Sequence, residues 1–309
     1  MAFGNDCNND LSINAYSPRE MACKAETVGV AKANMGFLST FVLAILAGAF
    51  IALAACFYTT AMTGMPSGLV GPTRLLGGLP FSLGLILVVV AGAELFTGNT
   101  LIIIATISGK VRFTQLLRNW TVVYLGNLVG SVATVALVYF AWQWKMGDMA
   151  VGIAAYNIAA KKLTLPFFTA FCSGVLCNVL VCLAVWLCYS ARSTTDKILS
   201  IIFPITAFVA LGFEHSVANM YLIPYGMMLA RTGEFTDNPA IAGHLKADPS
   251  IFTISNCISN LIPVTLGNIV GGAILVGLVY WIVYLRGEKR GLLDDQDEIP
   301  EQVIITERR

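Results

Sequence analysis

Stretches without any charged residue dominate the sequence, and their lengths predict the number of membrane spans. A helix needs about 20 apolar residues to cross the hydrocarbon core of a bilayer. Four stretches are long enough for one span with some loop: 33–73, 119–144, 163–191 and 249–285. Four shorter ones form two pairs, each divided by a single glutamate: 75–93 with 95–109, and 198–213 with 215–230. Each pair is too long for one straight span and too short for two. We therefore predict six spans, with the second broken at Glu94 and the fifth at Glu214.

The composition supports an all-α integral membrane protein. Only 12% of the 309 residues are charged and 57% are hydrophobic, whereas a soluble domain carries roughly 25% charged residues. So few charges cannot cover a water-facing surface, which excludes a soluble enzyme. The net charge of +1 offers no basic surface for nucleic acid. None of the eight cysteines forms a C-x-x-C pair. We interpret them as packing residues and expect no disulfide, metal or cofactor.

Lysine and arginine are distributed unequally between the two sides that six spans define. Thirteen belong to the N-terminal segment, the 2–3 loop, the 4–5 loop and the C-terminal tail. Six belong to the opposite side: Arg74, Lys145, Lys161, Lys162, Arg231 and Lys246. Since the more basic side of a membrane protein is cytoplasmic, we expect both termini in the cytoplasm. No apolar run near the N-terminus is long enough for a cleavable signal peptide.

The spans form one membrane domain, residues 37–286, with a short segment at each end. Residues 1–36 contain the run Ser17-Pro18-Arg19-Glu20, which combines a capping serine, proline at the first helical position and glutamate three residues after the cap. This run predicts a cytoplasmic helix that ends near Gly36. Residues 287–309 are expected to form a disordered cytoplasmic tail because they are strongly polar.

The two predicted breaks share one pattern, G-x-E-x-x-x-x-N, at residues 92–99 and 212–219. The span after each break also matches, with Gly-Asn-x-Val-Gly at 126–130 and at 267–271. The chain therefore divides into two three-span repeats, and the odd number of spans inverts the second repeat. Inverted repeats with broken helices indicate a transport site near the membrane midplane. The N-terminus of the half-helix after each break favours an anion there.

The residues at the breaks carry the candidate chemistry. His215 is the only histidine inside a span, and it either donates protons in a pore or binds a neighbouring helix. Glu94 and Glu214 either relay protons or cap the second half-helix, and their matched placement favours capping. Asn99 and Asn219 stand five residues after them and can satisfy the same break. Thr97 offers its hydroxyl to a substrate or to the backbone, and the sequence leaves both open.

Three further polar residues lie near the fourth span. Lys161 and Lys162 stand just before it. They are either an interfacial pair or a vestibule charge that attracts anions. Asn178 lies deep inside that span, so we expect its side chain to face the bundle interior.

At these residues the sequence resembles the formate/nitrite transporter family. The resemblance rests on the motifs at residues 91–99, 178–186 and 212–220 and extends from about Pro18 to Arg286. Residues 81–87 and 260–268 resemble the bacterial formate branch. Two features depart from that branch, namely Glu94 in place of aspartate and Gly98-Asn99 in place of Ser-Thr. The family resemblance implies an aquaporin-like protomer in a homopentamer, with one pore per protomer, in the cytoplasmic (inner) membrane.

The resemblance also assigns roles to residues. It implies that His215 is the central pore histidine, with Asn219 as its partner. It places the loop threonine at Thr97, the fourth-span asparagine at Asn178 and the vestibule lysine at Lys162. Four apolar residues are implied as constrictions: Leu85 and Leu95 on the cytoplasmic side, Phe81 and Phe208 on the outer side.

The function expected from these features is passage of formate and similar small monovalent anions, with protons supplied at His215. The expected partners are these anions, protons, further copies of the chain and the lipid bilayer. A nitrite or hydrosulfide channel of the same family remains an alternative, as does a channel for water or ammonia. A membrane enzyme or sensor is disfavoured because the sequence has only two histidines and its intramembrane carboxylates lie in matched breaks.

Overall fold

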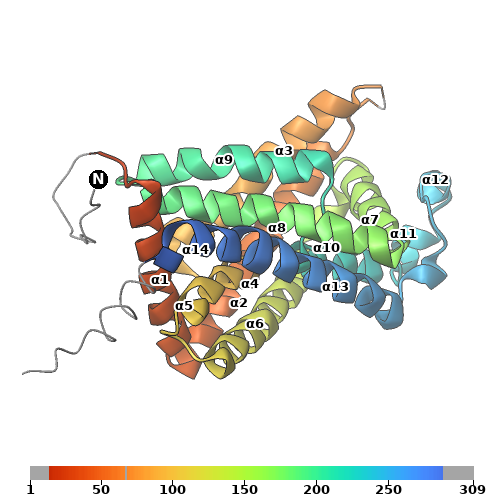
Figure 1. The fold of residues 1–309 in the computed structure, drawn as a ribbon. Helices are drawn as coiled ribbons and strands as arrows, with labels where there is room; N and C mark the ends of the chain where they lie inside the picture. The colour runs from red at the N-terminus through yellow and green to blue at the C-terminus, as the bar shows by residue number, and fades with distance from the viewer. Residues whose placement is uncertain (1–13, 67, 288–309) are drawn as a thin grey trace, which may run out of the picture.

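The computed structural model describes residues 14–66 and 68–287, which form an all-helical bundle (Figure 1). Within these residues, six helical segments are long and apolar enough to cross a membrane, so the prediction of six spans in an all-α protein is confirmed. The spans are α2 (Phe37–Met62), α3 (Val70–Ile86) with η1 (Leu87–Gly92), α6 (Phe113–Phe140), α8 (Phe167–Ser190), α9 (Thr194–Leu211), and α13 (Ile254–Ile269) with η5 (Val270–Leu278) and α14 (Val279–Tyr284).

Shorter helices complete the bundle. They are α4 (Phe96–Asn99), η2 (Thr100–Ile102), α5 (Ile103–Ile107), η3 (Gln143–Lys145), α7 (Ala150–Leu163), α10 (Ser216–Leu229), α11 (Gly233–Thr236), α12 (Pro239–Ala242) and η4 (Pro249–Ile251). Helical structure stops between Gly92 and Phe96, and again between Leu211 and Ser216. Gly92 and Gly212 have φ angles of 84° and 75°, which only glycine adopts without strain. The glycine of each motif therefore turns the chain out of the preceding helix.

The N-terminal helix α1 (Pro18–Asn34) begins where the sequence predicts. Ser17 Oγ accepts a hydrogen bond from the Glu20 N–H at 3.4 Å, and Glu20 Oε2 accepts one from the Ser17 N–H at 2.7 Å. This reciprocal pair satisfies two N–H groups that the first turn leaves free. The predicted helix start is confirmed, while its cytoplasmic side stays a prediction. Cys7 and nearly all of the predicted tail lie outside the described residues.

The segments predicted to be cytoplasmic gather at one end of the bundle, beside α1 (Figure 1). Arg192 Nε donates to Asn14 O at 2.9 Å, which joins the 4–5 loop to the N-terminal segment. Trp281 Nε1 donates to Ser108 Oγ at 3.0 Å, which joins α14 to the 2–3 loop. Helices α7, α11 and α12 lie at the opposite end. The described chain thus begins and ends on one side, as an even number of spans requires.

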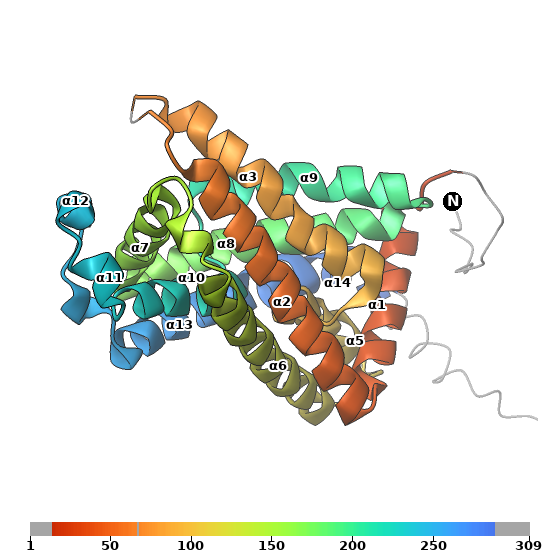
Figure 2. The same cartoon turned by 180° about the vertical axis from the view of Figure 1, so that it is seen from behind.

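Helix α2 crosses α6, and α8 crosses the span formed by α13 and η5, at small residues. Figure 2 shows the first pair from the side where α2 passes in front. A Cβ atom on Gly130 would lie 1.9 Å from Ile45 O, and one on Gly271 would lie 2.2 Å from Val175 O. Glycine at these two positions lets the backbones touch, because any side chain would collide with a neighbouring carbonyl.

Substitution of Gly130 or Gly271 by alanine is expected to disrupt assembly. Overpacking costs about 1–3 kcal/mol or more when the neighbour cannot move, and here the neighbour is helix backbone. The yield of intact oligomer from detergent measures the effect. Gly36→Ala is the matched control, because a Cβ there meets no atom within 4 Å and the φ of −62° suits alanine. Equal yields of the Gly130→Ala and Gly36→Ala proteins would contradict the expectation.

Candidate functional site

Two cavities enter the bundle, one beside α7 and one beside α1. The cavity on the α7 side has a volume of about 530 Å³, and the cavity on the α1 side has a volume of about 460 Å³. Phe81, Phe208 and His215 line the first, and Leu85 and Leu95 line the second. Lys162 also lines the first cavity, whereas Thr97, Asn178 and Asn219 are not among the residues that line either one.

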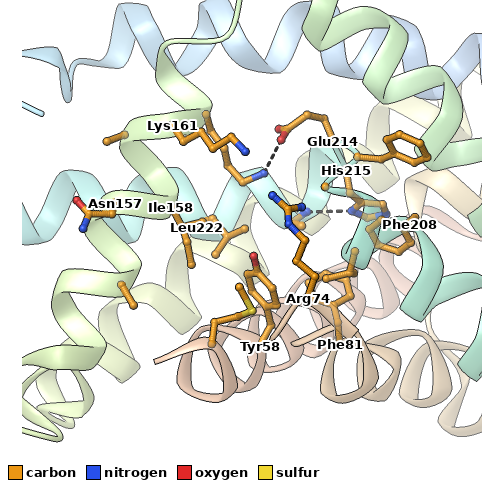
Figure 3. A pocket seen from close by; sticks show the side chains of 18 of the residues that line it. Tyr58, Arg74, Phe81, Asn157, Ile158, Lys161, Phe208, Glu214, His215 and Leu222 are labelled. Atoms are coloured by element: carbon orange, nitrogen blue, oxygen red, sulfur yellow. Dashed lines mark hydrogen bonds and ion pairs between the residues drawn. The ribbon is translucent and has the colours of Figure 1, made fainter. Parts of the chain in front are cut away.

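The four predicted constriction residues are buried apolar side chains. The rings of Phe81 and Phe208 meet edge to face, with centroids 5.5 Å apart, and the Phe208 ring stacks on the His215 ring at 5.8 Å. The aromatic pair therefore stands next to the histidine in the α7-side cavity (Figure 3). Leu85 and Leu95 line the α1-side cavity.

His215 and Thr97 come from the two breaks and meet in the protein interior. His215 Nε2 lies 3.0 Å from Thr97 Oγ1, and both residues are buried. His215 Nδ1 accepts a hydrogen bond from the Ala218 N–H at 3.0 Å, so the histidine caps α10 with its own ring. Because Nδ1 is an acceptor, the neutral ring carries its proton on Nε2 and directs it toward Thr97.

Each glutamate of the breaks forms an ion pair with a lysine from a different helix. Glu94 Oε1 lies 2.6 Å from Lys32 Nζ of α1, and Glu214 Oε1 lies 2.8 Å from Lys162 Nζ of α7. The second carboxylate oxygen of each accepts a hydrogen bond from the asparagine five residues later, at 2.7 Å in both cases. The glutamate and asparagine of each motif therefore act as one unit.

A second asparagine completes each unit. Asn119 Oδ1 accepts from Asn99 Nδ2 at 2.9 Å, and Asn119 Nδ2 donates to Lys32 O at 3.1 Å. Asn260 makes the same two bonds, with Asn219 and with Lys162 O, both at 2.8 Å. We name these units the α1 cluster and the α7 cluster. The α1 cluster is Lys32, Glu94, Asn99 and Asn119, and the α7 cluster is Lys162, Glu214, Asn219 and Asn260.

The expectation that Glu94 and Glu214 cap the second half-helices is wrong. Asn127 Oδ1 accepts from the Phe96 N–H at 3.0 Å, and Asn268 Oδ1 accepts from the Ser216 N–H at 2.9 Å. The amide nitrogens of the same asparagines donate to the carbonyl oxygens of the two glutamates, at 2.9 Å and 3.1 Å. The glutamate carboxylates bind lysine instead, because an amide can satisfy the backbone of a break without burying an unpaired charge.

Asn178 binds backbone carbonyl groups, and Asn219 binds other side chains of the α7 cluster. Asn178 is fully buried, as expected, and its Nδ2 lies within hydrogen-bonding distance of Asn268 O at 2.6 Å and Thr97 O at 3.2 Å. The side chain of Asn219, which the resemblance pairs with His215, donates instead to Glu214 and to Asn260.

The sequence interpretation missed five site residues: Lys32, Asn119, Asn127, Asn260 and Asn268. A signal for Lys32 exists in the chain, because it precedes Phe37 at the start of α2 by the same five residues that separate Lys162 from Phe167 at the start of α8. The spacing that the two halves share therefore includes the lysines at the ends of α1 and α7.

Both cavities carry more positive than negative charge. The residues lining the α7-side cavity include four cationic side chains and one carboxylate: Arg74, Lys161, Lys162, Lys246 and Glu214. Those lining the α1-side cavity include three lysines and one carboxylate: Lys24, Lys32, Lys197 and Glu94. Burial lowers the pKa of Lys24, and the nearby charges of Lys197 and Arg192 lower that pKa further. Cationic clefts raise the local concentration of anions.

We searched the described residues for groups of side chains that could bind a metal ion. No group of three histidine, cysteine, aspartate or glutamate side chains in that part lies close enough together to hold a metal ion.

Comparison with known proteins gives consistent matches over nearly the whole chain. A family model described as formate/nitrite transporter matches residues 19–282. The formate channel FocA of Escherichia coli (strain K12) is 46% identical over 270 residues, which cover 87% of this chain and 94% of the relative. FocA of Haemophilus influenzae is 45% identical over 273 residues, with 88% and 95% covered. A solved pentameric formate channel with formate bound has 46% identity and a TM-score of 0.73 over 81% of this chain and 98% of that chain.

Proposed function

The chain belongs to the formate/nitrite transporter family, and from this premise we propose that it conducts formate and related small monovalent anions across the membrane. The observation that carries the proposal is the contact between His215 and Thr97, which stands between two cavities with an excess of cationic side chains. The named relatives are formate channels rather than enzymes. This agrees with a pore that binds its substrate transiently and does not convert it.

We further propose that the protomers assemble as a homopentamer of aquaporin-like subunits, each with its own pore. The second and fifth spans are broken, and the two halves form an inverted repeat. The matched bonding of the α1 cluster and the α7 cluster supports this, because chance rarely repeats four contacts among corresponding residues. The end that holds α1 faces the cytoplasm, since thirteen lysines and arginines belong to that side. The remaining apolar surface contacts lipid.

The apolar constrictions determine what can pass. The side chains of Phe81, Phe208, Leu85 and Leu95 themselves offer no hydrogen-bonding group to an ion that passes between them. A bare anion between them loses its water and gains little in return, which costs several kcal/mol. A neutral acid crosses the same rings at far lower cost, so protonation near the centre favours passage.

His215 supplies this proton in our proposal. The neutral ring already uses Nδ1 as an acceptor from Ala218 and points Nε2–H at Thr97. Transfer of the Nε2 proton would leave an imidazolate, so transfer requires a second proton on Nδ1, and this proton displaces the Ala218 N–H. Acid pH supplies that proton. The Thr97 hydroxyl then passes a proton from Nε2 to the anion, and flux rises as pH falls.

Anion flux into proteoliposomes of the purified protein tests the function. Formate, nitrite and hydrosulfide are compared at acid and at neutral pH, and liposomes without protein are the control. We expect fast formate uptake that increases at acid pH. A clear preference for nitrite or hydrosulfide would place this protein with the nitrite or hydrosulfide channels of the family instead. Water or ammonia flux without anion flux would contradict the proposal.

A further inference from the structure

The α7-side cavity contains a second cationic site that is separate from the α7 cluster. Lys162 does not supply a free charge there, because its ammonium lies 2.8 Å from the Glu214 carboxylate. Glu214 is the one carboxylate among the described residues that line the cavity. An anion entering from this side therefore needs a cation other than Lys162. This inference rests on the proposed function and concerns how its substrate is recognised.

Arg74 is the cation placed to meet such an anion. It lies in the first half of α3, is half-buried and extends its guanidinium into the cavity near Phe81, Phe208 and His215 (Figure 3). Lys161 and Lys246, by contrast, are exposed at the cavity mouth. Of the described cationic side chains that line this cavity and have no carboxylate partner, Arg74 is thus the one that is half-buried.

The guanidinium is fixed in position and still has free donors. Its Nη1 donates to Ala210 O, in the last turn of α9, at 3.1 Å. Gly212 makes room for it, since a Cβ there would lie 2.7 Å from Arg74 Nη1. A guanidinium has five N–H donors, and among the described residues the others have no acceptor. The carbonyl at the end of α9 therefore orients the Arg74 guanidinium, and the remaining N–H donors are available to a ligand in the cavity.

The arrangement of the free N–H donors determines which class of anion Arg74 binds best. A guanidinium binds two oxygens of one carboxylate through two parallel hydrogen bonds, whereas an ammonium acts as a point charge. We propose that Arg74 binds the carboxylate group of the entering anion beside the Phe81–Phe208 pair, and that it sets the preference for planar two-oxygen anions over single-atom anions. Arg74 is then a specificity-determining residue of the α7-side cavity.

Substrate saturation curves of Arg74 variants test this inference. Arg74→Gln removes the charge, and Arg74→Lys keeps the charge while removing the two-point geometry. We expect both to raise the half-saturating formate concentration about tenfold, as loss of one charge-assisted two-point contact predicts. The maximal formate rate stays near the wild-type value. For hydrosulfide, Arg74→Lys keeps the wild-type half-saturation.

The matched control is Lys161→Gln, which removes one positive charge from the mouth of the same cavity. An equal formate shift in Lys161→Gln would overturn the inference, because bulk electrostatics would then explain it. Wild-type half-saturation in assembled Arg74→Gln would also overturn it. Size-exclusion chromatography shows whether Arg74→Gln still assembles. If it does not, Arg74→Lys alone provides the test. Absent formate flux in the wild-type protein would instead overturn the proposed function itself.

Discussion

Replacing His215 with phenylalanine is expected to remove the rise in formate flux at acid pH. Among the described residues, His215 is the one titratable side chain hydrogen-bonded to the Thr97 hydroxyl, and phenylalanine can neither hold nor donate a proton. Without the proton, the anion must cross the apolar constrictions in its charged form. A penalty of about 3 kcal/mol corresponds to a roughly hundredfold loss of flux. Formate uptake at acid and neutral pH measures both effects.

His215→Asn is the control that separates proton donation from structure. His215 also caps α10 by accepting the Ala218 N–H, and phenylalanine loses this cap, which alone costs about 0.5–2 kcal/mol of stability. Asparagine is a good capping residue but does not titrate. We expect His215→Asn to retain the assembled oligomer and still lose the acid-stimulated flux. An unchanged pH profile in His215→Asn would contradict the proton role.

Replacing Lys162 with methionine is expected to destabilise the protein by about 3–5 kcal/mol, the usual cost of leaving one partner of a buried ion pair alone. The side chains of Lys162 and Glu214 are only 13% and 7% exposed, so water solvates the remaining carboxylate poorly. The free energy of unfolding in mixed micelles measures the loss. A protein as stable as the wild type would show that the pair is solvated or dispensable.

The double variant Lys162→Met with Glu214→Gln isolates the buried charge as the cause. Glutamine keeps an oxygen for Asn219 and removes the negative charge, so most of the lost stability is expected to return. The α1 cluster offers an internal comparison. Lys32 is 25% exposed beside a 6% exposed Glu94, and solvent screens such a pair more strongly. Lys32→Met is therefore expected to cost less than Lys162→Met.

The span count and the class of protein could be predicted from the chain alone. A bilayer has one thickness and tolerates few charges, so charge-free stretches count spans without any knowledge of packing. The start of α1 was equally predictable, because a capping box acts over four neighbouring residues. Matching motifs also marked residues 92–99 and 212–219 as special, since a glycine with positive φ leaves a local signature.

Tertiary structure alone decided which polar groups bind one another. The sequence placed Glu94 and Glu214 at the breaks but assigned their carboxylates to helix capping, whereas Lys32 and Lys162 bind them across separations of 62 and 52 residues. Asn127 and Asn268 instead accept from the first N–H groups of the second half-helices, across separations of 31 and 52 residues. Hydropathy and turn signals depend only on residues that are neighbours in the sequence. A buried hydrogen bond depends on which side chains meet after the helices pack, so its partners follow from the fold and not from the order of residues.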